Sequence, residues 1–305
     1  MSSTVADAVA TLKAGELVIT PTETVYGLAA DAANAEAVAR IYEAKGRPRF
    51  NPLIAHAADL DMAGRVAVLD DRAKALAAEF WPGPLTIVAP VRDSGLVCDL
   101  ARAGLETVAV RIPSHPLART LLMQFGNPLV APSANRSGRP SPTTYPDAVE
   151  ETGASAAAAL DGGPCAVGLE STVVALLDRP RLLRPGSVTR QGIEAVIGPL
   201  AEAEVDAKRS PGRLAAHYAP DAPVRIDADA PREGEVYIGF GPSSDPTGLN
   251  LSPSGDLREA AANLFKLFRE ADRLRPAGIA VAPVPADGLG EAINDRLRRA
   301  AGFVG

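Results

Sequence analysis

Short apolar runs alternate with segments of helical apolar spacing from residue 1 to about residue 198, and this alternation limits the fold more than any other feature of the sequence. Runs of this length are typical of strands, and their regular exchange with helices predicts an α/β fold. We expect functional residues at the strand ends, because a rigid sheet positions these loops while their backbone groups stay available. The predicted strands cover residues 16–20, 53–56, 85–91, 107–112, 129–132, 172–177 and 181–184.

Two polar residues mark the starts of predicted helices. Thr4 precedes apolar residues at helical spacing, and Gly15 follows them. Asn34 precedes a second segment of this kind, whose last turn carries Lys45. Both residue types favour the N-cap, where the side-chain oxygen accepts a hydrogen bond from a free backbone N–H.

The pattern is interrupted near residue 199 and starts again near residue 224. Residues 199–223 combine charge, proline and glycine with weak periodicity, which is typical of a linker. With 47% apolar residues in 305, the chain can bury one large core and one smaller core. The sequence therefore predicts a first domain over residues 1–198, the linker, and a small α/β domain over residues 224–305.

The predicted small domain has two strands, a long helix between them and a final helix. The strands cover residues 235–240 and 278–283, and the final helix covers residues 290–300. The long helix is amphipathic, with an apolar face formed by Leu257, Leu264, Leu267, Phe268 and Leu274.

Charge and composition exclude several classes of protein. The formal net charge of −6 argues against binding nucleic acid by overall electrostatics, which needs an excess of Lys and Arg. No apolar run is long enough to span a membrane, and the N-terminus lacks the pattern of a signal peptide, so we expect a soluble, cytoplasmic protein. Cys98 and Cys165 lie far apart without a CxxC motif, which indicates neither a disulfide framework nor a zinc site.

The segment ITPTETVYGLAADA, residues 19–32, is the first candidate for ligand binding. Thr22, Thr24 and Tyr26 could present hydroxyl groups to a ligand beside a backbone that Gly27 lets come close. Alternatively, the segment is a turn whose threonines cap the next element.

The next segment is basic and rigid. Lys45, Arg47 and Arg49 lie near Pro48 and Pro52, an arrangement that suits a polyphosphate because fixed cations neutralise phosphate oxygens. The alternative is a solvated helix end, where cations are also favoured.

Arg111 lies in VAVRIP, a predicted apolar strand, where its charge needs a partner. The partner could be a structural carboxylate such as Glu106 or Glu170, or the carboxylate of a ligand held by both arms of the guanidinium. The sequence alone slightly favours the structural partner.

APSANRSGRPSPTTY, residues 131–145, follows a predicted strand and is rich in hydroxyl groups. Its serines and backbone N–H groups could line a phosphate or a nucleotide, although an ordinary irregular loop is equally compatible with it. Ser171 and Arg184 lie in similar positions at strand edges. The sequence lacks GxxxxGK[ST], GxGxxG, HExxH and GxSxG, so known phosphate loops, zincins and nucleophile elbows are not indicated.

Together these segments resemble the YrdC-like threonylcarbamoyl-AMP synthase family in its longer, two-domain branch. The resemblance spreads over residues 20–220, about two-thirds of the chain, and the motifs occur in one order. They are PTETVYGL, the KxR pair Lys45 and Arg47 followed by NPL and His56, PGPLT, VAVRIP, the SxN pair Ser133 and Asn135, LESTVV, LLRPGS and HYAP.

The resemblance implies a twisted, open α/β sheet around a deep, positively charged cavity, joined by the linker to a small C-terminal Rossmann-like α/β domain. It implies that Lys45, Arg47 and Arg111 are catalytic. Threonine would be held by Thr24, His56, Arg111, Ala131 and Ser171. ATP would be held by Lys45, Arg47, Asn51, Thr107, Ser133, Asn135, Ser141 and Arg184.

The implied reaction joins L-threonine, bicarbonate and ATP, with Mg²⁺, into threonylcarbamoyl-AMP for modification of a tRNA adenosine. A separate transferase complex would then act on tRNA, so tRNA contact by this chain would be weak or indirect. The linker motif SPGRLAAHYAP, Ser210–Pro220, would cover the cavity, with Ala215 at a position that is tyrosine in some members.

Two other functions compete with this one. YrdC-like domains can bind RNA on a basic concave surface, but the net charge and the absence of aromatic clusters argue against this function. A related enzyme adenylates carbamoyl phosphate, but it usually carries acylphosphatase and zinc-finger regions, for which this chain lacks the length and the cysteines.

Overall fold

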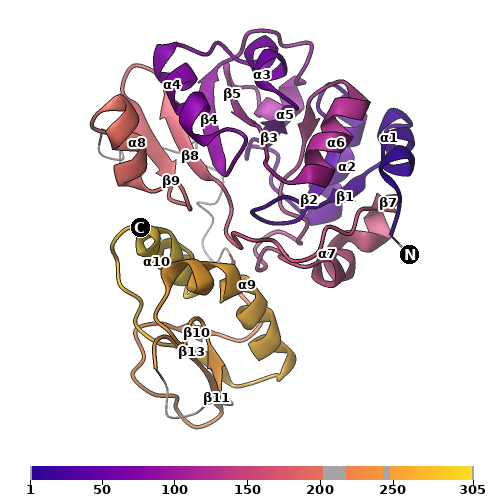
Figure 1. Cartoon of the computed structure of the whole chain (residues 1–305). Coiled ribbons are helices and arrows are strands. Elements are labelled where there is room, and N and C mark those ends of the chain that lie inside the picture. The colour runs from indigo at the N-terminus through magenta and orange to yellow at the C-terminus, as the bar shows by residue number, and fades with distance from the viewer. Residues whose placement is uncertain (1, 202–217, 243–247, 304–305) are drawn as a thin grey trace.

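The computed structural model describes residues 2–201, 218–242 and 248–303. Figure 1 shows a larger part built on a nine-stranded sheet and, below it, a smaller part built on a four-stranded sheet. Among the described residues, no helix combines the length and the apolar character that crossing a membrane requires.

The larger sheet has the order β7-β1-β2-β6-β3-β5-β4-β8-β9 and mixes parallel with antiparallel pairs. Each strand predicted in this part overlaps an observed strand, with bounds that differ by one or two residues, whereas β2 and β7 were not predicted. The strands are β1 (Val18–Thr20), β2 (Gly27–Asp31), β3 (Ile54–His56), β4 (Leu85–Pro90), β5 (Thr107–Arg111), β6 (Leu129–Val130), β7 (Ala158–Ala159), β8 (Thr172–Leu176) and β9 (Pro180–Arg184).

Both predicted N-caps are confirmed. The Thr4 side chain accepts a hydrogen bond from the backbone of Asp7, and the Asp7 carboxylate accepts one from the backbone of Thr4, while Asn34 caps the second helix. The helices of the larger part are α1 (Val5–Lys13), α2 (Ala35–Lys45), α3 (Leu60–Val66), α4 (Asp71–Phe80), α5 (Asp99–Arg102), α6 (Pro116–Phe125), α7 (Tyr145–Thr152), the 3₁₀ turn η1 (Gly153–Ser155) and α8 (Arg190–Ile197).

The smaller part is a parallel sheet of order β10-β13-β11-β12 with two helices packed on it. The prediction that Leu274 belongs to the apolar face of the long helix is wrong, because this residue caps the helix end and is 66% exposed. The elements are β10 (Val224–Arg225), β11 (Glu235–Gly239), β12 (Leu249–Asn250), α9 (Leu257–Arg273), β13 (Gly278–Val281) and α10 (Leu289–Ala300).

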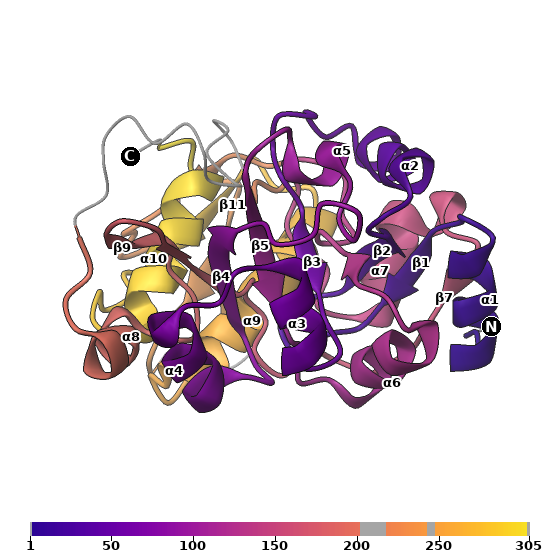
Figure 2. The same cartoon turned by 90° about the horizontal axis from the view of Figure 1, so that it is seen from above.

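The two parts share a packed interface. Val25 and Leu169 of the larger part belong to the same buried apolar cluster as Phe265 and Phe268 on α9. Figures 1 and 2 show the smaller part on one side of the larger sheet, with α3 and α4 on the opposite side. The smaller part therefore covers the side of the sheet on which residues near 25 and 169 lie.

Candidate active site

A polar cavity lies where β3, β5, β6, β8 and β9 and the loop after β1 come together. Its lining confirms that several separate motifs of the sequence meet at one place. The lining residues are Thr24, Val25, Arg47, Pro52, Leu53, Ile54, His56, Arg111, Ala131, Pro132, Ser133, Glu170, Ser171, Arg184 and Tyr218. The predicted site residues that it brings together are Thr24, Arg47, His56, Arg111, Ala131, Ser133, Ser171 and Arg184.

Arg111 is fixed at the end of β5 by hydrogen bonds from all three of its nitrogen atoms. Its Nη2 donates to Glu23 Oε1 at 2.6 Å, its Nη1 to Thr24 Oγ1 at 2.9 Å and its Nε to the Gly83 carbonyl at 3.1 Å. A guanidinium has about five N–H donors. These three bonds leave one N–H donor on each terminal nitrogen unused, and a carboxylate can accept from two such donors of one guanidinium.

The structural partner of Arg111 is Glu23, so the prediction of Glu106 or Glu170 is wrong. Glu106 precedes β5, at the opposite end of the strand, and Glu170 instead pairs with Arg296 at 3.1 Å. Burial raises the pKa of the Glu23 carboxyl, but the charge of Arg111 and its hydrogen bond outweigh burial and leave this pKa below its ordinary value. Glu23 is thus ionised and fixes the orientation of Arg111.

His56 lies directly beside Arg111, because parallel pairing of β3 with β5 puts the two residues in register. Burial, together with the positive charge of Arg111, lowers the pKa of His56 from its ordinary value of 6.5 to about 3. The imidazole is therefore neutral at neutral pH, and it offers a hydrogen-bonding group rather than a cation.

The neutral His56 predicts a specific loss of stability in acid. Below pH 6.5 the unfolded chain binds a proton that the folded chain excludes until about pH 3, so the free energy of unfolding falls as the pH falls through this window. We expect this residue to remove about 2 kcal/mol between pH 7 and pH 5, since one pH unit is worth about 1.4 kcal/mol. Urea unfolding at both pH values should show a smaller loss for His56→Gln than for wild type, and equal losses would contradict the prediction.

The opposite wall is held by three neighbouring strands. Arg184 at the end of β9 donates from Nε to the Ser171 carbonyl at 3.0 Å and from Nη2 to Ser171 Oγ at 3.1 Å. Thr86 on β4 shares a hydrogen bond of 2.7 Å with the same hydroxyl group. The predicted threonine ligand Ser171 and the predicted ATP ligand Arg184 are therefore in direct contact.

Lys45 and Asn135 lie behind the lining, where they hold the loop that carries Ser133. Lys45 Nζ donates to the Ser133 carbonyl at 2.5 Å and also to the Asn135 carbonyl, while the Asn135 amide donates to the carbonyls of Arg136 and Arg139. Burial and nearby Arg47 lower the pKa of Lys45 well below its ordinary value. Direct contact of Lys45 and Asn135 with phosphates remains a prediction.

We expect Lys45→Met to reduce the free energy of unfolding by about 1–3 kcal/mol, because it leaves two buried carbonyl groups without their donor. Lys13→Met is the matched control, since Lys13 occupies the last turn of α1 as Lys45 occupies that of α2, but is exposed. Urea unfolding of both variants tests this. A Lys45→Met variant as stable as Lys13→Met would show that Lys45 does not hold the loop.

The other predicted ATP ligands, Asn51, Ser141 and Thr107, are not among the lining residues, and their contact with ATP stays a prediction. Asn51 is buried, and its Oδ1 has no hydrogen-bond partner among the described residues. Ser141 donates to Glu170, which does line the cavity. Thr107 begins β5, two residues before Ala109, the partner of Ile54 in the lining.

Sequence reasoning missed Glu23, Glu170 and Tyr218 as parts of the site. Each of these residues belongs to a motif that the sequence analysis had noted: PTETVYGL, LESTVV or HYAP. The motifs do not indicate, however, which of their residues face the cavity. Tyr218 lines the cavity and is 1% exposed. The rest of the predicted cover, residues 210–217 with Ala215, lies outside the described residues.

The cavity favours anions. Among the described residues, Arg47, Arg111 and Arg184 line it, against one carboxylate, that of Glu170. Burial lowers the pKa of Arg47 to about 10, so this group is still charged at neutral pH. Within the described residues no group of three or more His, Cys, Asp and Glu side chains could hold a metal ion.

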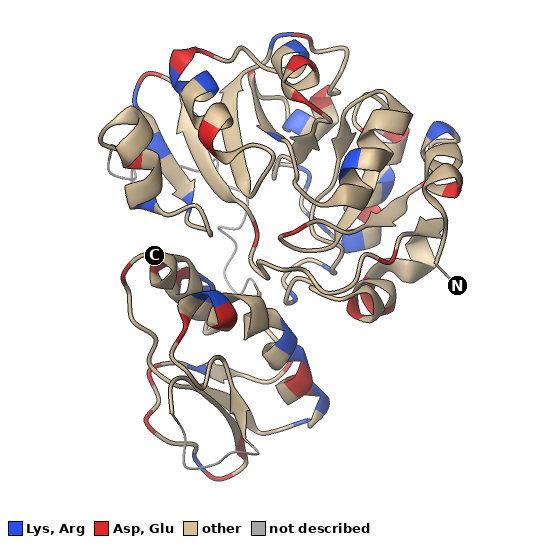
Figure 3. Ribbon diagram, viewed as in Figure 1, with Lys and Arg blue, Asp and Glu red and all other residues tan. Residues whose placement is uncertain are grey.

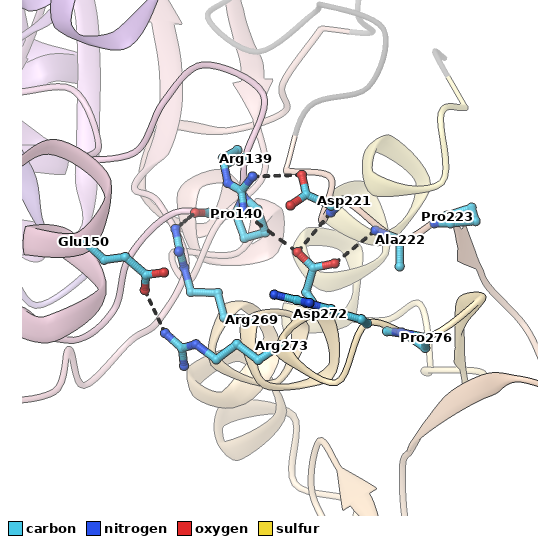
Figure 4. Close-up of a pocket in the computed structure, with 11 residues that line it drawn as sticks. Arg139, Pro140, Glu150, Asp221, Ala222, Pro223, Arg269, Asp272, Arg273 and Pro276 are labelled. Carbon is cyan, nitrogen blue, oxygen red and sulfur yellow. Dashed lines mark hydrogen bonds and ion pairs between the residues drawn. The ribbon is translucent and has the colours of Figure 1, made fainter.

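A larger cavity of about 560 Å³ lies between α7 and α9, and most of its charged side chains are paired (Figure 4). Arg139 bonds Asp221 at 2.8 Å, and Arg273 bonds Glu150 at 3.0 Å. Figure 3 shows acidic and basic positions side by side along α9. This cavity belongs to the ion-paired interface between the two parts, and the smaller cavity around Arg111 is the candidate active site.

Comparisons with known proteins match both parts of the chain. Residues 10–186 match the Sua5/YciO/YrdC family, described as telomere recombination, and residues 188–302 match the threonylcarbamoyl-AMP synthase C-terminal domain. The chain is 40% identical to the threonylcarbamoyl-AMP synthase of Bacillus subtilis over 325 residues, covering 98% of this chain and 93% of the relative. It is also 40% identical to that of Pyrococcus abyssi over 316 residues, with 96% and 92% covered.

A solved structure agrees with this match. The crystal structure of P. abyssi Sua5 complexed with L-threonine has a TM-score of 0.89 to this chain and 39% sequence identity, and the alignment covers 98% of this chain and 94% of that one.

Proposed function

The chain belongs to the family of threonylcarbamoyl-AMP synthases that carry the additional C-terminal domain, and from this premise we propose that the cavity around Arg111 joins L-threonine, bicarbonate and ATP. The products are threonylcarbamoyl-AMP and pyrophosphate, used in modifying a tRNA adenosine. The observation that carries the proposal is the placement of the Arg111–His56 pair and the Arg184–Ser171 pair around one cavity.

Threonine binding is assigned to the Arg111 side. The two free N–H donors of Arg111 match the two oxygens of an amino-acid carboxylate, and Glu23 holds the guanidinium in place for them. Neutral His56 is too weak a base to take a proton from an amine, so we assign it a hydrogen-bonding role. Thr24 and Ala131 complete this side of the lining, and Ser171 is assigned to threonine from the opposite wall.

The reaction is assigned two steps. The threonine amine attacks bicarbonate, forms the carbamate C–N bond and releases water. A carbamate oxygen then attacks the α-phosphorus of ATP, and the bond to pyrophosphate breaks. Because AMP is transferred, the enzyme is a nucleotidyltransferase. No protein nucleophile is needed, and positioning and charge stabilisation supply the catalysis.

Phosphate binding is assigned to the cations opposite Arg111. Arg47 and Arg184 would neutralise the charge of the triphosphate, with Ser133 as a hydrogen-bonding group. Mg²⁺ is assigned as part of the MgATP substrate, because Mg²⁺ favours phosphates and water over protein cages. In the part of the chain that the structure describes, the one lining carboxylate is Glu170, which already bonds Ser141 and Arg296.

The cavity around Arg111 is too small for ATP in this conformation. The cavity around Arg111 measures about 60 Å³, whereas pockets for small molecules usually measure about 300–1,000 Å³. Tyr218 belongs to the predicted cover and is a buried part of the cavity wall. We therefore propose that the cover motif reaches the site through Tyr218.

We also propose that a separate transferase complex collects the product and contacts the tRNA.

The test is pyrophosphate release from MgATP with threonine and bicarbonate supplied together or omitted singly. We expect release only when both are present. Release without threonine would contradict the proposal and favour an enzyme that uses carbamoyl phosphate, which can then be added as the substrate. RNA binding that weakens with salt, without any nucleotide turnover, would favour an RNA-binding module.

A further inference from the structure

Arg296 on α10 is a fully buried charge that the proposed reaction does not use. It extends from the C-terminal domain to two segments at the wall of the active site. Its Nε donates to Glu170 Oε2 at 3.1 Å, and its Nη1 donates to the Pro185 carbonyl at 2.7 Å. Both partners belong to the larger part of the molecule.

The two segments carry assigned ligands. Glu170 directly precedes Ser171, and Pro185 directly follows Arg184. Ser171 and Arg184 are hydrogen-bonded to each other at the cavity wall. In the proposed function, Ser171 contacts threonine and Arg184 contacts ATP. One side chain of the C-terminal domain, Arg296, therefore bonds the chain neighbour of each of these two ligands.

Arg296 also contacts the described end of the cover motif. Its guanidinium carbon lies 5.4 Å from the centre of the Tyr218 ring, within the range of a cation–π interaction. Tyr218 has an αL backbone with φ of 66° and lines the cavity. Asp295 on the same helix bonds Arg296 Nη1 at 3.0 Å and so holds the guanidinium in this orientation.

We propose that Arg296 is a positioning residue for the reaction, through which the C-terminal domain sets the positions of Ser171, Arg184 and Tyr218. This inference rests on the proposed function. It gives the C-terminal domain a role in the chemistry that differs from simply carrying the end of the linker. The planar fork of arginine is required, because one group must reach a carboxylate, a carbonyl and a ring face together.

The pH dependence of activity can distinguish a positioning role of Arg296 from a purely structural one, because Arg296 lies beside the carboxylate of Glu170. Arg296 from α10 and Arg184 from β9 face this carboxylate, with Ser141 bonded to it, and Lys45 on α2 and Tyr218 also lie within electrostatic range. Burial raises the pKa of Glu170, but the charges of Arg296 and Arg184, with the Ser141 and backbone hydrogen bonds, together outweigh burial and keep this pKa below its ordinary value. Without Arg296, the pKa of Glu170 rises, and activity is lost at a higher pH than in wild type.

The experiment measures pyrophosphate release by the full chain with Arg296→Met and Arg296→Lys, against pH and against each substrate. Arg298→Met is the matched control, because Arg298 lies on the same helix and is exposed. For Arg296→Met we expect KM values for threonine and ATP about tenfold higher, since small displacements of positioned groups are costly. We also expect the acid limb of kcat/KM to move to higher pH. Arg296→Lys keeps the charge, so it should raise both KM values with little shift of the acid limb.

Adding Glu170→Gln to Arg296→Met should remove the shift of the acid limb, which would tie the pH effect to this carboxylate. If Arg296→Met does not fold, the KM values of Arg296→Lys for threonine and ATP test the inference, and values equal to those of Arg298→Met would contradict it. Variants that behave as Arg298→Met does, or that only lower the amount of active enzyme without changing KM or the pH profile, would overturn the inference. Inactive wild-type protein would instead mean that the proposed function fails.

Discussion

Arg111→Lys is expected to lower kcat/KM for threonine by about 100-fold. A hydrogen bond to a charged group is worth about 1.5–3 kcal/mol, and about 1.4 kcal/mol corresponds to tenfold. Lysine keeps a positive charge beside Glu23 but loses the fork that could bind both oxygens of a carboxylate while bonding Thr24. The loss should appear mainly as a higher KM for threonine, measured by pyrophosphate release.

The conservative substitution is needed because of Glu23. Arg111→Ala would leave this carboxylate buried without its ion pair, a change that costs about 3–5 kcal/mol in comparable cases and would mix unfolding with loss of binding. Arg102→Lys is the matched control, since Arg102 is also buried and donates to Asp99 and to the carbonyls of Val97 and Leu105, away from the cavity. An Arg111→Lys variant with the threonine KM of Arg102→Lys would contradict the assignment.

The part of the site that could be predicted from the sequence consists of residues close to strand ends. His56 ends a predicted strand, Arg111 is the next-to-last residue of another, and parallel pairing makes them neighbours. Their place near strand ends marked this region as a place to look for functional groups, but the resemblance to the family, not strand position, assigned both residues to the site. Their mutual register, however, depends on tertiary pairing and could not be obtained from either strand alone.

Partners could not be predicted where they come from distant segments. Arg111 needed a carboxylate, but the choice of Glu23 rather than Glu106 depends on how the loop after β1 folds back over β5. Lys45 shows the same limit, since its position in the last turn of a helix suggested an exposed or phosphate-facing cation. Its bonds to Ser133 and Asn135 join segments about 90 residues apart.

Fold elements were missed where local pattern is weak. β7 has only two residues, Ala158 and Ala159, and is defined by its pairing with β1. β2 was included in the predicted apolar stretch after the threonine loop, because its residues are mostly small and buried and do not alternate. Both strands are specified by neighbouring strands rather than by their own sequence.

Gly168→Ala is expected to reduce activity by more than tenfold, because this glycine lets the C-terminal domain pack beside the active site. A Cβ atom at Gly168 would lie 2.4 Å from Ala262 Cα and 2.7 Å from the Ala261 carbonyl oxygen, so α9 would have to shift. The next residues are Leu169, in the shared apolar cluster, and then Glu170 and Ser171 at the cavity wall. Displacement of α9 would therefore disturb the segment that Arg296 holds, and misplacement of about 1 Å can cost about 100-fold in rate.

Gly163→Ala separates this contact from backbone strain. Gly163 has the same φ of +74° as Gly168, but a Cβ atom there would meet nothing within 4 Å. Both variants should lose about 1–2 kcal/mol of unfolding free energy from the left-handed backbone conformation, and only Gly168→Ala should also lose activity in the protein that remains folded. Thermal unfolding together with pyrophosphate release measures both effects. If the two folded variants are equally active, backbone strain alone explains the effect of Gly168→Ala. Close packing of α9 on this loop would then not be required for the reaction.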